Sequence, residues 1–110
     1  MEQIKKEQIS IIVFSKGRPL QLHAYLESLF LFSDAEQKMV TILYSETVNI
    51  RYKKIMQCFP QVNWIQEQQF ETDLKQLVTD AGEYIMFGCD DVVFTVKFCL
   101  TEAASCLAKN

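Results

Sequence analysis

Short apolar runs recur along the chain, and each is rich in β-branched or aromatic residues. The first run, residues 9–14, reads Ile-Ser-Ile-Ile-Val-Phe without regular alternation, which is typical of a strand that is covered on both faces. The last run, residues 84–87, is apolar throughout, so it too is expected to be a buried strand, and after two small residues it leads to two adjacent carboxylates. Runs of this kind predict about four strands, at residues 9–14, 39–44, 62–66 and 84–87.

Amphipathic segments lie between these runs. Three leucines recur at helical spacing after Pro19, and proline suits the first position of a helix because its missing N–H costs nothing there. In the third helix, Thr72 is expected as the N-cap and Gly82 as the residue just past the C-cap. The predicted helices cover residues 19–32, 49–59, 72–81 and 101–109.

Strands that alternate with helices of about 10 to 15 residues indicate βαβ units, and hence a parallel sheet with right-handed crossovers. The expected fold class is therefore α/β, with a Rossmann-like parallel sheet of about four strands and helices on both faces. The chain has 110 residues, of which 49% are hydrophobic and 12% aromatic. It is long and apolar enough to bury the core of one compact domain over residues 1–110.

The chain is slightly acidic, with a formal net charge of -3 and a pI near 5.1. Its 11 basic residues are scattered rather than gathered into a stripe. Proteins that bind nucleic acids usually carry a basic footprint, because neutralising phosphates supplies most of their affinity. We therefore expect no nucleic-acid partner.

Cysteines occur at positions 58, 89, 99 and 106, and none of them forms a C-x-x-C pair. The first residues, Met-Glu-Gln-Ile-Lys-Lys-Glu, lack the apolar segment of a signal peptide. No apolar run approaches the roughly 18 residues that a membrane span needs. The simplest interpretation is a cytoplasmic protein with no membrane span and with reduced, mostly buried thiols.

Polar residues follow each of the predicted strands. In a parallel sheet the carboxyl ends of the strands lie along one rim, which is where open α/β sheets bind their ligands. The segments expected at this rim are Ser15-Lys16-Gly17-Arg18, Ser45-Glu46, Gln66-Glu67 and Asp90-Asp91.

Asp90 and Asp91, which follow the fourth strand, form the main candidate site. Two adjacent carboxylates offer hard oxygen ligands, which suit Mg²⁺ or Mn²⁺ shared with substrate phosphates. Lys16 and Arg18 would add positive charge near a diphosphate, and that charge favours departure of a phosphorylated leaving group. The structural alternatives are a turn in which Asp bonds the nearby backbone, and a solvated loop for the two basic residues.

Glu46 follows the second strand, where a carboxylate can accept hydrogen bonds from the base or ribose of a nucleotide. Its alternative role is in the first turn of the next helix, where the helix dipole favours negative charge. The sequence contains no G-x-S-x-G, P-loop or G-x-G-x-x-G motif of other enzyme classes. The chain has 3 glycines, which leaves little room for such glycine-rich motifs. No catalytic residue is assigned.

Two segments resemble the GT-A-type glycosyltransferases that use nucleotide-sugars, particularly family 2. Residues 80–91 read Asp-Ala-Gly-Glu-Tyr-Ile-Met-Phe-Gly-Cys-Asp-Asp. This is similar to the family's Ala-x-Gly-Glu-Tyr-Ile segment, which precedes an Asp-x-Asp or Asp-Asp metal motif. Residues 11–18 match in part its Pro-Thr-Tyr-Asn-Arg-like segment. The departures are Phe14, Lys16 and Gly17 in place of the usual Pro, Tyr and Asn.

The resemblance implies that Asp90 and Asp91 hold the diphosphate of a nucleotide-sugar through Mn²⁺ or Mg²⁺. It also implies that Ser15, Lys16 and Glu46 contact the nucleotide. The implied activity is that of a hexosyltransferase, which moves the sugar of a nucleotide-diphosphate sugar to an acceptor that the sequence does not identify.

Members of that family are usually much longer than this chain, and their second half supplies the acceptor pocket and the catalytic base. The chain is therefore expected to correspond to the N-terminal half of a GT-A fold. Three interpretations stay open: a fragment of a longer enzyme, a short protein that binds nucleotide-sugars without turnover, and an α/β interaction module that retains only the fold. The expected form of the third is a homo-oligomer that buries the surface which the second half would cover.

Overall fold

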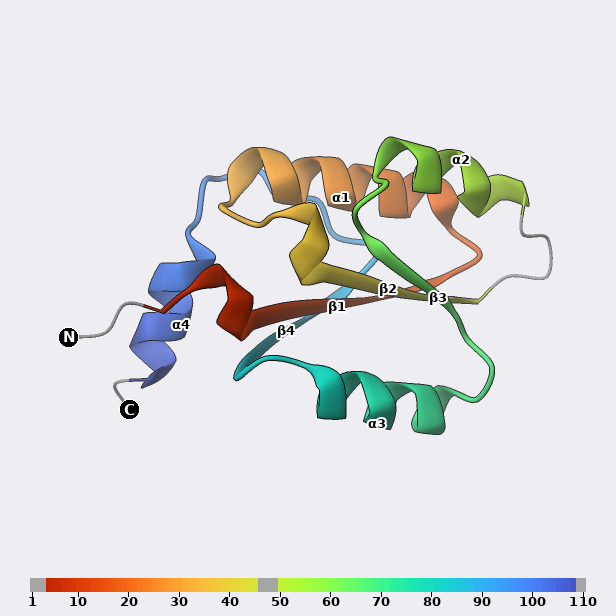
Figure 1. Cartoon of the computed structure of the whole chain (residues 1–110). Helices are drawn as coiled ribbons and strands as arrows, with labels where there is room; N and C mark the ends of the chain where they lie inside the picture. The colour runs from red at the N-terminus through yellow and green to blue at the C-terminus, as the bar shows by residue number, and fades with distance from the viewer. Residues whose placement is uncertain (1–3, 46–49, 109–110) are drawn as a thin grey trace.

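The computed structural model of the chain describes residues 4–45 and 50–108. A single sheet of four parallel strands runs through the middle of the molecule, in the order β3-β2-β1-β4 (Figure 1). The strands are β1 (Ile9–Lys16), β2 (Val40–Ser45), β3 (Asn63–Gln66) and β4 (Tyr84–Cys89). The predicted α/β class and Rossmann-like parallel sheet are confirmed.

Helices cover both faces of this sheet. Figure 1 shows α1 and α2 on one face and α3 on the other, with α4 at the end of the sheet where the strands begin. The helices are α1 (Pro19–Phe32), α2 (Ile50–Cys58), α3 (Phe70–Asp80) and α4 (Leu100–Ala108), with 3₁₀ turns η1 (Lys6–Gln8) and η2 (Gln37–Met39). All the predicted helices are present, and their ends lie within two residues of the prediction.

The hydrophobic core lies between the sheet and α1. Ile11 and Val13 of β1 pack there with Leu26 of α1, and all three side chains are fully buried. Burial of such a side chain contributes about 1.5 to 3 kcal/mol to folding. Alternate residues of a strand face the same side, so Ser15 shares this face at the carboxyl end of β1. The core therefore brings the Ser15 side chain toward the α1 and α2 side of the rim.

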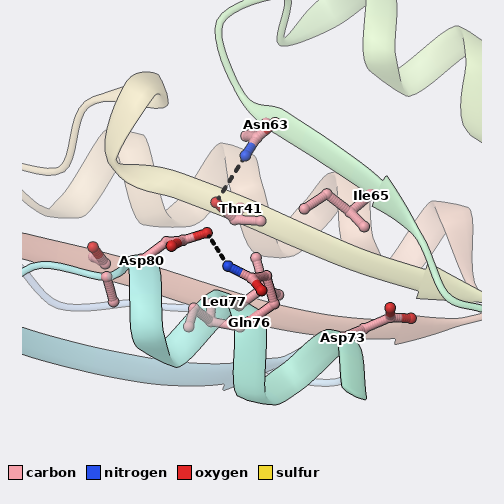
Figure 2. Close-up of a pocket in the computed structure, with 10 residues that line it drawn as sticks. Thr41, Asn63, Ile65, Asp73, Gln76, Leu77 and Asp80 are labelled. Atoms are coloured by element: carbon pink, nitrogen blue, oxygen red, sulfur yellow. Dashed lines mark hydrogen bonds between the residues drawn. The ribbon is translucent and has the colours of Figure 1, made fainter. Parts of the chain in front are cut away.

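The opposite face of the sheet is less tightly packed. No residue of α3 is fully buried. A cleft of about 270 Å³ lies between α3 and the sheet (Figure 2). On the sheet side Asn63 donates a hydrogen bond to Thr41, and on the helix side Gln76 donates one to Asp80 (Figure 2). These four polar side chains of the cleft thus bond one another in pairs.

The prediction that the fourth strand is buried is wrong for β4. This strand forms one edge of the sheet, and its residues are only partly buried or exposed. Phe87 is 54% exposed, although its ring stacks on Phe14 with 6.0 Å between the centroids. β4 is open because it has a neighbour on one side only and because α3 covers its outer face incompletely.

The first turn of α3 differs from the prediction, because Gln69 rather than Thr72 is the N-cap. Asp73 makes the stabilising contacts there. Its Oδ2 accepts hydrogen bonds from the backbone N–H groups of Gln68, at 2.7 Å, and Gln69, at 3.1 Å. A carboxylate also complements the positive end of the helix dipole, so the N-cap of α3 lies three residues earlier than expected.

Gly82 follows the C-cap of α3, as predicted. It does not have the left-handed backbone that usually explains glycine at this position. Among the described residues, the positive φ angle belongs to Gly17. A Cβ atom on Gly82 would lie 2.5 Å from the carbonyl oxygen of Gln8. The Gly82 N–H also donates to Ser10 Oγ at 2.9 Å. Glycine is needed at this position because two backbone segments approach closely.

The expectation of mostly buried thiols is also wrong. Cys58, Cys89 and Cys106 are exposed, and Cys99 is half-buried. Cys58, Cys89 and Cys106 lie at or near the ends of α2, β4 and α4, where these elements reach the surface. These small apolar side chains therefore do not fill the core. Within the described residues, no helix combines the length and the apolar character that crossing a bilayer requires.

Candidate metal and nucleotide site

Backbone hydrogen bonds fix the loops at the carboxyl ends of the central strands. Gly17 has a left-handed backbone with φ of 65°, and its N–H donates to the carbonyl of Ser45 at 2.9 Å. The N–H of Asp90 donates to the carbonyl of Phe14 at 3.2 Å. Since β1 lies between β2 and β4, these bonds attach the ends of both neighbouring strands to the end of β1. The described residues of the rim segments that follow these three strands therefore lie together.

Asp90 is a buried carboxylate, with 3% of the residue exposed. The Ser15 hydroxyl donates to Asp90 Oδ2 at 2.8 Å and lies 2.7 Å from the Tyr52 hydroxyl. Tyr52 in turn accepts the backbone N–H of Arg18 at 3.1 Å. Because the Ser15 proton is committed to Asp90, Tyr52 donates to Ser15. The hydrogen bonds thus run in one direction, from Arg18 through Tyr52 and Ser15 to the carboxylate.

The basic residues predicted for the site lie at its open side. Arg18 Nη1 is 3.8 Å from Asp90 Oδ1, and the Arg18 side chain is 55% exposed. Lys16 is exposed at the end of β1. Glu46, the predicted contact to the base or ribose, lies outside the described residues. The described part of the rim therefore combines a fixed buried carboxylate with cationic side chains that face solvent.

Asp91 is exposed beside the buried Asp90, and Cys89 is exposed on the other side of it. The potential ligand atoms of these three residues all lie within 4.8 Å of one another. Two carboxylates and a thiol are suitable donors for a divalent cation, and such a set leaves coordination positions open for a ligand. The two carboxylates fit the Mg²⁺ or Mn²⁺ that the sequence suggested, whereas the thiol is a soft ligand that these ions do not favour.

Gly88 holds the end of β4 against α1. A Cβ atom at this position would collide with the hydroxyl of Tyr25. Burial, with a smaller contribution from the nearby Cys89, raises the pKa of Tyr25 to about 12, so its hydroxyl stays neutral. Among the described residues this buried hydroxyl has no hydrogen-bond partner. The absence of a side chain at Gly88 thus lets β4 lie close to α1 immediately before the acidic residues.

Tyr52 and Cys89 belong to the site but were not predicted for it. Tyr52 lies within the predicted helix 49–59, and a buried tyrosine usually finds a partner for its hydroxyl. Cys89 was interpreted as core, although it stands next to the acidic pair. Two signals in the sequence could have predicted these residues for the site. Tyr52 carries a phenol on the inward face of a helix, and Cys89 carries a thiol next to two carboxylates.

Together, the fold and the rim define the general class of the protein. It is an α/β protein with a Rossmann-like parallel sheet, and a cluster of acidic and thiol side chains lies at the carboxyl end of the sheet, where proteins of this class bind ligands.

The chain matches no protein-family model. It is similar to the bifunctional glycosyltransferase pgtA of Dictyostelium discoideum, with 35% identity over 120 aligned residues. The alignment takes in 98% of this chain but 15% of that protein, so the chain spans a small part of the length of its relative. This similarity supports a glycosyltransferase-like domain.

Proposed function

We propose that this chain is the nucleotide-binding half of a GT-A-type glycosyltransferase. In this proposal it binds a nucleotide-diphosphate sugar through Mn²⁺ or Mg²⁺, with Asp90 and Asp91 as the ligands from the acidic motif. The observation that carries the proposal is the position of Asp90. This carboxylate is buried at the rim and fixed by Ser15, in a chain that is similar to a glycosyltransferase along nearly its whole length.

Each described residue of the rim has a role in this proposal. The cation, when bound, neutralises the diphosphate. Asp90 fixes the position of the ion, while Asp91 is exposed and adapts to it. Lys16 and Arg18 attract the phosphates electrostatically. Ser15 takes part through its hydrogen bond to Asp90, and Glu46 is assigned to the base or ribose.

The proposed reaction is transfer of the sugar to an acceptor. The acceptor oxygen forms a bond to the anomeric carbon as the bond from that carbon to the diphosphate breaks, and the nucleoside diphosphate leaves. The rim supplies contacts to the donor, and we assign no catalytic base to it. Donor binding is therefore the activity that we propose for these 110 residues by themselves.

Calorimetric titration tests the proposal. The purified chain is titrated with UDP, GDP and their sugar conjugates, each with and without Mn²⁺. We expect binding that requires the cation and favours one base. In the double variant Asp90→Asn with Asp91→Asn, we expect the affinity to fall by about a hundredfold, because the proposed charged ligands are lost.

Glu102→Gln is the matched control, since it removes one exposed negative charge on α4, at the opposite end of the sheet. It should bind as the unchanged chain does. The proposal is wrong if the doubly substituted chain, shown to be folded by circular dichroism, still binds the nucleotide in a cation-dependent way with unchanged affinity.

One observation favours a second function, that of a non-catalytic α/β interaction or oligomerisation module. Large apolar side chains are exposed along β4 and the segment that follows it. These exposed residues are Phe87 on β4, and Val92, Val93 and Val96 in the segment that follows it. Exposed apolar side chains near an unpaired strand edge commonly mark a surface that binds another chain.

A further inference from the structure

Another cleft lies on the α1 and α2 side of the molecule, and the acidic cluster is not part of it. Residues of the two helices line it, together with Gly17 of the loop between β1 and α1. Figure 1 shows these helices next to each other on one face of the sheet. The volume of the cleft is about 710 Å³, and sites for small molecules typically have about 300 to 1,000 Å³. The cleft is therefore large enough for an organic molecule.

The walls of this cleft are largely apolar. Ile55 of α2 is buried in its wall, whereas Leu20 in the first turn of α1 is 81% exposed. The ring of His23 packs against Phe59 with 5.6 Å between the centroids, and this contact joins α1 to the residue that follows α2. An apolar molecule in the cleft would remove Leu20 from water, and burial of apolar surface is a main driving force of binding.

The charge that lines the cleft is positive. No aspartate or glutamate belongs to the described lining. His23 Nε2 already lies 3.2 Å from Glu27, which is outside the lining. Lys54 is exposed in the wall and forms no ion pair with a described residue. The first turn of α1 also has no acidic residue and no side-chain cap, so its positive end adds to the charge of Lys54.

We propose that this cleft binds a small anionic amphiphile, which is a molecule with one phosphate or carboxylate group on an alkyl body. The alkyl body lies against Leu20 and Ile55, and the anionic group lies at Lys54. Inorganic phosphate lacks the apolar body and a neutral alcohol lacks the charge, so neither satisfies both parts of the cleft. The inference goes beyond the proposed function, because it involves neither the acidic pair nor a nucleotide.

Calorimetric titration of the purified chain with octyl phosphate tests this inference. Inorganic phosphate and octanol are titrated separately, since each carries one half of the proposed ligand. EDTA is present throughout, so that no cation at the acidic pair can bridge a phosphate to the protein. We expect octyl phosphate to bind at least about tenfold more tightly than either of the other two.

Lys54→Gln and Leu20→Ser separate the two parts of the cleft. Lys54→Gln should lower the affinity for octyl phosphate by about fivefold or more and leave octanol binding unchanged, whereas Leu20→Ser should lower both. The matched controls are Lys53→Gln and Leu31→Ser. Lys53 is the exposed neighbour of Lys54 outside the lining, and Leu31 is an exposed leucine near the other end of α1. Neither control should change binding, and since all four side chains are exposed, each variant should keep its circular dichroism spectrum.

Three results would overturn the inference. The first is a folded chain that does not bind octyl phosphate. The second is an equal loss of affinity in Lys53→Gln and Lys54→Gln, which would indicate attraction to the general surface charge. The third is binding to phosphatidylserine vesicles without binding of octyl phosphate, which would make Leu20 part of a surface that faces a membrane. Each of them leaves the proposed function standing, because cation-dependent nucleotide binding is measured separately.

Discussion

At the scale of single residues, the acidic pair is asymmetric. Asp90 is buried and receives the hydrogen bond of Ser15, whereas Asp91 is exposed. A hydrogen bond to a charged group contributes about 1.5 to 3 kcal/mol, and a chain of hydrogen bonds that runs through Tyr52 and Ser15 polarises each of its members. One carboxylate is thus held in place before a ligand arrives, and its neighbour remains adaptable.

Gly88→Ala tests the close approach of β4 to α1. The new methyl group would meet the Tyr25 hydroxyl, so we expect a loss of about 1 to 3 kcal/mol in the free energy of unfolding. Urea denaturation followed by circular dichroism measures this loss. The end of β4 leads directly to the acidic pair, so cation affinity should fall as well.

Tyr25→Phe is the matched partner of that variant. It removes a buried hydroxyl that has no partner among the described residues, so by itself it should leave stability unchanged or raise it slightly. In the Gly88→Ala background it should restore part of the lost stability, because the nearest atom that the methyl group meets is gone while the ring carbon Cζ, at 2.8 Å, remains. Purely additive effects of the two changes would contradict this explanation.

At the scale of elements, Asp34 attaches α4 to the rest of the fold. Its Oδ1 accepts the N–H of Leu100 at 2.7 Å, and its Oδ2 accepts the hydroxyl of Thr101 at 3.1 Å. The segment before α4 returns along α1, where the N–H of Phe98 donates to Phe32 O at 2.8 Å. Asp34 follows α1 in the sequence, so it caps α4 from a position 66 residues away.

Asp34→Asn should weaken this attachment in a pH-dependent way. Burial by itself would raise the pKa of Asp34, but hydrogen bonds from Leu100, Cys99 and Thr101 outweigh it and lower the pKa. The group therefore stabilises the fold above its unfolded pKa of about 3.9, and this contribution is lost as the pH falls through the lower folded value. At neutral pH we expect a cost of about 1 kcal/mol, which is typical of a lost cap.

Urea denaturation of both chains across the acidic range measures this effect. The stability difference between the unchanged chain and Asp34→Asn should shrink as the pH falls below the unfolded pKa. A difference that stays constant into strong acid would show that the charge of Asp34 is not the cause.

At the scale of the whole molecule, the two faces of the sheet are unequal. α1 and α2 close one face over a continuous core, while α3 leaves a cleft on the other. β4 is an edge strand, and Phe87 on it and Val92, Val93 and Val96 after it are exposed. Such an edge has unpaired backbone groups next to apolar side chains, and that combination favours association with another chain.

Val93→Asp tests self-association through the exposed valines that follow β4. We expect sedimentation of the unchanged chain to report dimers, and the charged side chain to weaken them by about tenfold, equivalent to about 1.4 kcal/mol. Val78→Asp is the control, since Val78 is also exposed but lies on α3. A strictly monomeric chain at high concentration would argue against the interaction module.

Local patterns along the sequence were sufficient to predict the elements and the fold class. Apolar spacing and Pro19 placed α1, because helical periodicity depends only on nearby residues. The alternation of strands and helices then indicated a parallel sheet, which brings Ser15 and Asp90 together although they are 75 residues apart. The meeting of these two residues at the rim was therefore predictable before any contact was known.

Other features were decided only by the tertiary structure. The order of the strands makes β4 an edge and exposes Phe87, whereas the apolar run by itself suggested a buried strand. The approach of Gln8 explains Gly82, and the hydrogen bond to Ser15 brings Tyr52 into the site. The physical reason is the same in each case: burial and hydrogen-bond partners depend on segments far apart in the sequence, and the local pattern of apolar and polar residues does not contain that information.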